Sequence, residues 1–215
     1  MNYKLLSALM LVASGTTQAT PLLTESFDDI STLAGNDWYL INDSSPVGDT
    51  GWFQGNDGVF AAHSGAANSY IAANYLNAGF GGSISNWLIT PIVELSGRTT
   101  LSFYTRRNDS DFFDSLQVLF NTDGSTTLGS FTAMGNVSVN LFDASYPTDW
   151  MLVNVTFDLP TSANGRIAFR YAVDNTDFAG DYIGIDDVNV DVPEPATLAS
   201  LGLGLIALGR LRRRH

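Results

Sequence analysis

The sequence predicts an all-β fold, a β-sandwich or jelly roll in a single domain. Three observations predict it. Short runs alternate apolar with polar residues at a period of two, which is typical of half-buried strands. Clusters of Gly, Asn, Asp and Ser separate these runs, for example at 121–124 and 174–177. No long segment between residues 20 and 192 has a helical period. About 170 residues suffice for one hydrophobic core.

Four alternating runs are expected to form strands with one face on the core. Two of them place Leu, Val or Phe at every second position, a third ends its inward set in Thr, and the fourth carries two arginines on its other face. The inward sets are Leu101, Phe103 and Thr105; Leu116, Val118 and Phe120; Val153, Val155 and Phe157; and Ile167, Phe169 and Tyr171, with Arg166, Ala168 and Arg170 opposite the last set.

The last predicted strand changes its phase. Ile183 and Ile185 share one phase, Val188 and Val190 share the other, and the change falls at 186–187. A one-residue offset is what a β-bulge produces, so the pattern favours a bulge over a strand that simply ends in a polar edge.

The glycine-rich segment 79–82 is expected to be a turn. It has neither the lysine nor the following helix of a phosphate-binding loop.

The first 19 residues have the order of a secretory signal peptide. Lys4 is the only charged residue before Glu25, an apolar run spans 5–13, and small residues lead to Ala19, where cleavage is expected. The alternative is a membrane anchor, but the apolar run is shorter than the roughly 20 residues that span a bilayer.

Residues 193–215 have three parts: a Pro-Glu-Pro motif, an uncharged segment over 196–209 and an arginine-rich end. They resemble the PEP-CTERM sorting signal, as an alternative to a plain C-terminal anchor. The resemblance implies an exosortase-type processing enzyme and transient inner-membrane anchoring through a short apolar helix. It also implies display at the cell surface or in the exopolysaccharide matrix of a Gram-negative bacterium. The residues that carry it are Pro193, Glu194, Pro195, Arg210, Arg212, Arg213 and Arg214.

Residues 20–192 resemble choice-of-anchor J and cleaved-adhesin domains. Similar blocks occur in the family's order at 25–29, 86–91, 114–118, 166–171 and 182–188, and Trp150 stands between the third and the fourth block. The resemblance implies a galactose-binding-like or MAM-like jelly-roll sandwich that serves as a surface module.

The charge is strongly unequal along the chain. All 22 acidic residues lie between Glu25 and Glu194, where only five of the ten basic residues lie. So acidic a domain repels phosphate backbones, which excludes nucleic acid as a partner. The absence of cysteine excludes disulfides, thiolate metal sites and a cysteine nucleophile.

A structural Ca²⁺ site is one candidate for the acids. The resemblance implies that an acid of the first strand meets the acids of the last strand around a cation, with an acid after residue 42 completing the site. Carboxylates are the ligands that Ca²⁺ prefers. The alternative is acids that are merely solvated at strand ends. The candidate ligands are Glu25, Asp28, Asp43, Asp49, Asp186 and Asp187.

A glycan-binding face is a second candidate. Aromatic rings beside amides and carboxylates suit sugar rings, and the residues expected to form such a face are Trp38, Trp52, Tyr70 and Tyr75. The alternative is that these aromatic residues form the core. The 109–114 loop, with Phe112 and Phe113, is expected either to project as a lip or to tuck its rings inward.

Catalysis has little support, and no catalytic residue is predicted. Before the tail His63 is the one histidine, and no nucleophile elbow or zinc-binding helix is present. We therefore predict an exported, non-catalytic binding or adhesion module. The alternatives are a structural matrix protein without a specific ligand and a glycoside hydrolase with paired carboxylates.

Overall fold

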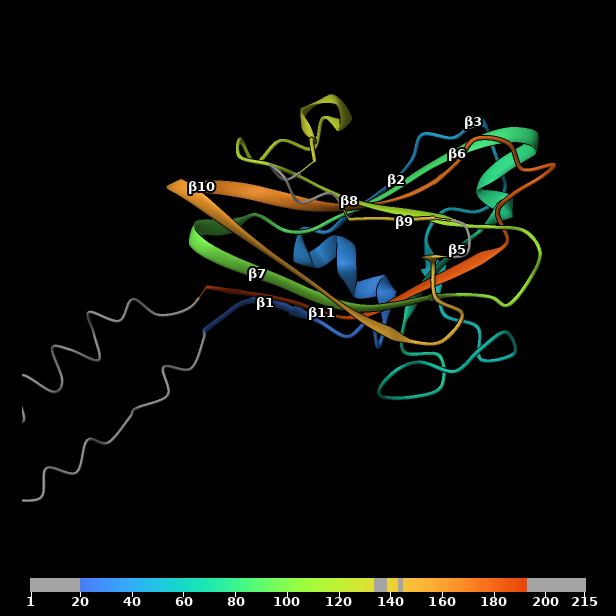
Figure 1. Cartoon of the computed structure of the whole chain (residues 1–215), viewed down its shortest axis with the longest axis horizontal. Helices are drawn as coiled ribbons and strands as arrows, with labels where there is room; N and C mark the ends of the chain where they lie inside the picture. The colour runs from blue at the N-terminus through green and yellow to red at the C-terminus, as the bar shows by residue number, and fades with distance from the viewer. Residues whose placement is uncertain (1–19, 134–138, 143–144, 193–215) are drawn as a thin grey trace, which may run out of the picture. The chain divides into compact units, whose positions relative to one another are not determined.

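The computed structural model describes residues 20–133, 139–142 and 145–192. Residues 21–192 form one compact unit with its own hydrophobic core. The unit is a β-sandwich of the jelly-roll type (Figure 1), as the alternating runs predict. The expected signal peptide with Ala19, and the expected sorting tail from Pro193 onward, lie outside the described residues.

Eleven strands and three short 3₁₀ helices are found among the described residues. In chain order they are β1 (Thr20–Glu25), η1 (Ile30–Asn36), β2 (Tyr39–Asn42), β3 (Ser45–Val47), β4 (Phe53–Gln54), β5 (Ile71–Asn74), η2 (Tyr75–Asn77), β6 (Ala78–Ile89), β7 (Val93–Arg107), β8 (Ser115–Asn121), η3 (Leu128–Ser130), β9 (Val139–Phe142), β10 (Met151–Val173) and β11 (Tyr182–Val192).

Strand β10 belongs to both layers of the sandwich. Its first part, up to Gly165, pairs with β7 in the layer ordered β10-β7-β11-β5-β4, where β1 also pairs with β11. From Arg166 onward it pairs with β8 on one side, and from Ala168 onward with β6 on the other, within the layer β2-β6-β10-β8-β9. An irregularity between Leu159 and Ala163 marks the approach to the crossing.

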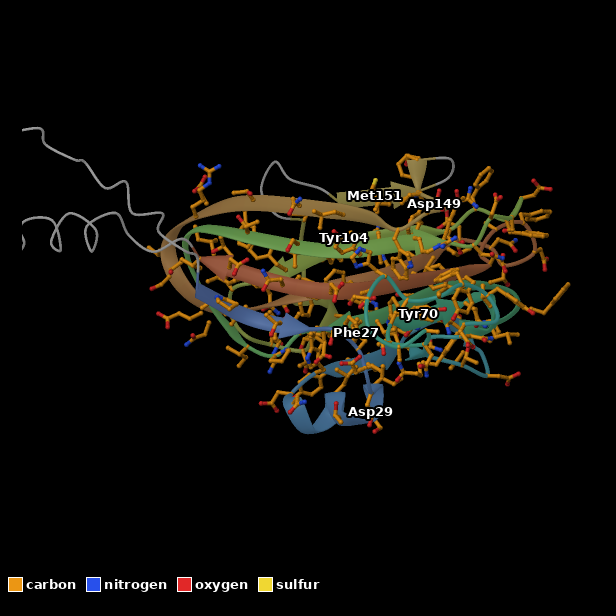
Figure 2. All side chains as sticks on the ribbon, turned by 90° about the horizontal axis from the view of Figure 1, so that it is seen from below. Phe27, Asp29, Tyr70, Tyr104, Asp149 and Met151 are labelled. Atoms are coloured by element: carbon orange, nitrogen blue, oxygen red, sulfur yellow. The ribbon has the colours of Figure 1, made fainter. Side chains whose placement is uncertain are left out.

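The core lies between the two layers. Most predicted inward residues of β7, β8 and β10 are buried there, and Phe120 and Val153 pack against the core while partly exposed. Phe103 and Phe169 are in edge-to-face contact, with 5.0 Å between ring centroids. Helix η1 lies along one open side of the sandwich and inserts Leu33 into the core (Figures 1 and 2). The period-two interpretation of these strands is therefore confirmed.

The predicted bulge in the last strand is present. The pairing of β11 with β7 shifts between Asp186 and Asn189, and Asp187 has a φ of 48°. Ile185 and Val188 are both buried although their phases differ. The bulge thereby places two consecutive carboxylates at one point of the strand.

The prediction of a simple turn at 79–82 is wrong. These residues are part of β6, and the pairing of β6 with β3 shifts between Ser45 and Val47. Gly81 has a φ of 67°, and a Cβ added to Gly82 would lie 2.7 Å from the carbonyl oxygens of Gly79 and Ser45. The glycines therefore allow an irregular strand to approach its neighbour closely.

Within the described ranges, no helix is long and apolar enough to cross a membrane.

Candidate functional site

The two carboxylates of the β11 bulge meet the loop that follows Phe60. Asp186 is fully buried, and its Oδ2 accepts hydrogen bonds from the backbone N–H groups of His63 (3.0 Å) and Ser64 (3.1 Å). Its Oδ1 accepts from the N–H of Asp187 at 2.7 Å. Burial raises the pKa of the Asp186 carboxyl to about 6, while these N–H groups act against the rise.

Asp187 holds the side chains of the same loop. Its Oδ2 lies 2.8 Å from Nδ1 of His63, and its Oδ1 accepts from the Ser64 hydroxyl at 2.8 Å. The His63 ring stacks on Tyr104, with 3.4 Å between ring centroids. Since Ser64 donates to Asp187 and not to His63, the three residues do not form a nucleophile–base pair.

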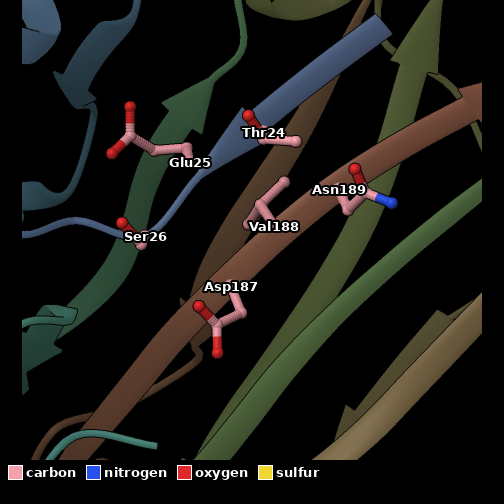
Figure 3. A pocket seen from close by; sticks show the side chains of 6 residues that line it. All are labelled: Thr24, Glu25, Ser26, Asp187, Val188 and Asn189. Atoms are coloured by element: carbon pink, nitrogen blue, oxygen red, sulfur yellow. The ribbon is translucent and has the colours of Figure 1, made fainter. Parts of the chain in front are cut away.

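Glu25 shares a pocket of about 300 Å³ with Asp187, between the end of β1 and the bulge (Figure 3). The two carboxylates point in different directions: Oε1 of Glu25 accepts from the N–H of Phe27 at 2.9 Å, and Asp187 faces the His63 loop. Asp28 is also near this loop, with Oδ1 3.0 Å from where a Cβ of Gly65 would lie. The predicted acids of both chain ends are thus neighbours.

Asp43 and Asp49 lie in another part of the sandwich. The N–H of Asp43 donates to the Ser85 carbonyl on β6, and the residues on either side of Asp49 donate to the carbonyls of Asn77 and Leu76. These two acids are therefore placed beside β6 and η2.

Three of the four aromatic residues expected on a ligand face are buried. Trp38 packs edge-to-face on Phe27, Trp52 is 6% exposed, and the Tyr70 hydroxyl donates to the carbonyl of Asn56. The structure favours the core alternative for them, because the sandwich interior needs large apolar side chains. Tyr75 is 47% exposed and remains available.

A groove of about 690 Å³ runs over the outer face of the β2-β6-β10-β8-β9 layer. Three half-exposed or exposed phenylalanines line it: Phe113 from the 109–114 loop, Phe142 at the end of β9, and Phe178 from the loop before β11. Both rings of the 109–114 loop are partly exposed, and that of Phe113 also lies under the Arg107 guanidinium, so the loop forms a partial lip. The polar lining consists of Ser83, Ser85, Asp114, Ser115, Gln117, Arg170, Asp174 and Asn175.

Arg170 is fixed within this groove. Its Nε donates to the Ser85 hydroxyl and its Nη1 to Oε1 of Gln117, both at 3.1 Å. The guanidinium lies over the Trp87 ring, 5.2 Å from the centroid. In the described part of the chain, no carboxylate lies within ion-pair distance of Arg170.

Asp114 also lines the groove, at the end away from Arg170. It is 1% exposed, and its Oδ1 accepts from the Tyr171 hydroxyl (2.6 Å) and the N–H of Asp181 (2.8 Å). Its buried Oδ2 has no hydrogen-bond partner among the residues described. Burial raises the pKa of the Asp114 carboxyl to about 6.

The groove is the feature that sequence reasoning missed. The pattern did place Arg170 on the face of its strand away from the core, which is the one signal that pointed to it. Phe142 and Phe178 stand outside the alternating runs, and nothing in the sequence indicates that they line the same groove as Arg170.

Comparison with known families finds one match. Residues 191–214 match the PEP-CTERM protein-sorting motif, as the tail's three parts predict. The motif marks the chain as an exported cell-surface protein of Gram-negative bacteria and implies processing by an exosortase. No curated protein matches the chain.

Solved structures match the sandwich. The K1 cleaved adhesin domain of Lys-gingipain from Porphyromonas gingivalis W83 is 20% identical, with a TM-score of 0.54, over 78% of this chain and 96% of that domain. The K3 cleaved adhesin domain of the same protein is 18% identical, with a TM-score of 0.56, over 81% of this chain and 99% of that domain. The chain therefore has the fold of cleaved adhesin domains, and at this identity the likeness shows the fold alone.

Proposed function

We propose that this protein is a non-catalytic binding module of the cell surface and that its groove binds an oligosaccharide. One observation supports the proposal most: the groove combines exposed phenyl rings with polar side chains that are already fixed in place. A groove of about 690 Å³ is within the range of small-ligand sites, roughly 300–1,000 Å³.

The chemistry of the groove suits a sugar chain. Phe142 and Phe178 are 50% and 77% exposed, so their faces are free to contact the apolar C–H faces of sugar rings. Gln117, Asn175 and the serines offer donors and acceptors for hydroxyl groups. Because Ser83, Ser85, Ser115 and Gln117 stand on paired strands, binding at these side chains costs little ordering.

Alanine substitution of the groove phenylalanines tests the proposal. Phe142→Ala and Phe178→Ala should each weaken oligosaccharide binding about tenfold, since each removes roughly 1.4 kcal/mol of contact. Binding is measured by calorimetry and by NMR shifts against a panel of neutral and acidic trisaccharides.

Tyr75→Ala is the matched control, because Tyr75 is an exposed aromatic residue that does not line the groove. It should bind as the unchanged protein does. Equal loss in Tyr75→Ala, or binding by none of the trisaccharides, would contradict the proposal and favour a structural matrix protein. Cleavage of a trisaccharide during the titration would instead assign a glycoside hydrolase.

We also propose that the pocket between Glu25 and Asp187 takes up Ca²⁺. The polar side chains that line the pocket carry oxygens of the kind that Ca²⁺ prefers: two carboxylates, the hydroxyls of Thr24 and Ser26 and the amide oxygen of Asn189. Glu25 and Asp187 now face other partners, so both would rotate toward the ion. A bound ion would join the first and last strands of the domain.

A third proposal concerns the tail. The uncharged segment 196–209 would hold the chain in the inner membrane for a short time, until an exosortase cleaves near Pro193, Glu194 and Pro195. A precursor that fractionates with the membrane, and a product that does not, would support this.

A further inference from the structure

Arg170 differs from Arg106, Arg107 and Arg166 in the groups that surround its guanidinium. Arg107 and Arg166 are buried, and their N–H groups donate to backbone carbonyls. Arg106 lies over the Phe60 ring, in the field of the Asp149 and Asp109 carboxylates. Arg170 instead lines an open groove, although the chain around it is rich in carboxylates.

The guanidinium of Arg170 is held in one orientation. Ser85 and Gln117 bind its Nε and Nη1, and Trp87 supports its face, while Nη2 has no acceptor among the described residues. A planar guanidinium with a free N–H edge suits the oxygens of an anionic group, and it loses little side-chain entropy when it binds one.

The groove separates its charges along the end of β10. Asp174 comes directly after β10 and four residues after Arg170, so at about 3.3 Å per residue the two positions are at most roughly 13 Å apart. Asp114 lines the groove near the same end as Phe178 and Asp174. A ligand therefore meets a cation at one end and carboxylates at the other, so only the first end suits a negative charge.

We infer that the groove selects a glycan that carries an acidic sugar and that Arg170 binds its carboxylate. This rests on the proposed oligosaccharide function. The phenyl rings contact the sugar faces, the carboxylate of one residue lies on the Arg170 edge, and the neutral hydroxyls of a neighbouring residue extend toward Asp174. The ligand class is thus an oligosaccharide in which one uronate residue stands beside neutral residues.

The test compares charged with neutral forms of the same sugars. Trisaccharides with one uronate residue (galacturonate, glucuronate or mannuronate) beside two neutral residues are titrated beside their carboxyl-reduced counterparts into residues 20–192, which contain the compact unit described above. At least one uronide should bind ten times more tightly than its reduced form, and added salt should diminish that preference.

Three variants locate the effect. Arg170→Gln should abolish the preference for the uronide while it leaves binding of the reduced form within about twofold. Arg170→Lys should keep part of the preference, because it retains the charge without the planar fork. Arg98→Gln removes an exposed arginine of the other layer and should bind as the unchanged protein does. Melting temperatures verify that each variant is folded.

The outcomes separate this inference from the function on which it rests. If the reduced sugars bind as tightly as the uronides and Phe178→Ala weakens both, the oligosaccharide site stands and the acidic preference is overturned. If Arg170→Gln weakens both forms equally, the carboxylate contact is likewise overturned. A sulfated trisaccharide that binds as tightly as the uronide would overturn the assignment to a carboxylate. Binding of neither form overturns both proposals.

Discussion

At the scale of single residues, Asp114 links protonation to folding. Its carboxyl is buried, and its Oδ2 has no partner within the described ranges. Burial raises its pKa from 3.8 to about 6, so the folded state holds a proton that the unfolded chain releases. The contribution of the Asp114 carboxyl to the free energy of unfolding is therefore fully present at low pH and is lost as the pH rises from about 4 to about 6.

Asp114→Asn should remove this dependence. Relative to the variant, the unchanged protein should lose on the order of 3 kcal/mol of unfolding free energy between pH 4 and pH 7, as a rise of the pKa from 3.8 to about 6 implies. Urea unfolding at several pH values measures it. Asp57→Asn, at an exposed position, serves as the control. If the unfolding free energies of the unchanged protein and of Asp114→Asn changed with pH in the same way, the raised pKa of Asp114 would be refuted.

Prediction at the level of residues succeeded where the signal lies in neighbouring positions of the sequence. The sequence located the bulge at Asp186 and Asp187 because these two residues interrupt an alternating run. It did not identify their contact with His63, because 123 residues separate His63 from Asp186. Nor does alternation reveal that Arg170 lies beside phenylalanines from two loops.

At the scale of elements, β10 depends on Gly165 where it leaves one layer for the other. A Cβ at this position would lie 2.3 Å from the backbone carbonyl oxygen of Asn121 and 3.0 Å from Leu95. A backbone atom cannot move aside as a flexible side chain can. The glycine therefore permits β8 and β10 to begin their pairing at Asn121 and Arg166.

Gly165→Ala should destabilise the fold by about 2–4 kcal/mol, because it overpacks a buried backbone contact. Gly35→Ala is the control: a Cβ there would meet nothing within 4 Å, and the change should stay within about 0.5 kcal/mol. Chemical denaturation compares the two. If Gly165→Ala destabilised the fold as little as Gly35→Ala, β8 and β10 would be able to move apart slightly at no cost in free energy.

The sequence predicted where strands occur, but it did not predict which of these segments belong to one continuous strand. Period-two alternation identified 153–157 and 167–171 as strands, but the structure shows both to be parts of β10. The segment 79–82 looked like a turn because glycine is common to turns and to irregular strands. Only the neighbouring strand, β3, decides between them.

At the scale of the whole molecule, the first and last strands close the sandwich side by side. β1 pairs with β11, and the Glu25–Asp187 pocket lies at their junction. An ion there would bind the folded state alone, since these carboxylates are far apart in the unfolded chain.

Millimolar Ca²⁺ should therefore raise the melting temperature of residues 20–192 above its value in EGTA. At a hundredfold excess over the dissociation constant the gain is about 2.7 kcal/mol, or roughly 5–10 °C for a domain of this size. Glu25→Gln and Asp187→Asn should lose the shift, whereas Asp43→Asn should keep it. An unchanged melting temperature would mean that His63 and backbone N–H groups already balance these acids.

The direction of β11 has a mechanical consequence. Tyr182 follows the loop that carries Phe178, which lines the groove, and β11 ends at Val192, where the matched sorting motif begins. Strand β11 (Figure 1) therefore leads from the groove to the C-terminal end of the domain. A surface protein held by this C-terminal end while its groove binds a polymer would be pulled along this strand. Such a pull loads the hydrogen bonds from β11 to β7 in shear, where they share the force instead of opening one after another.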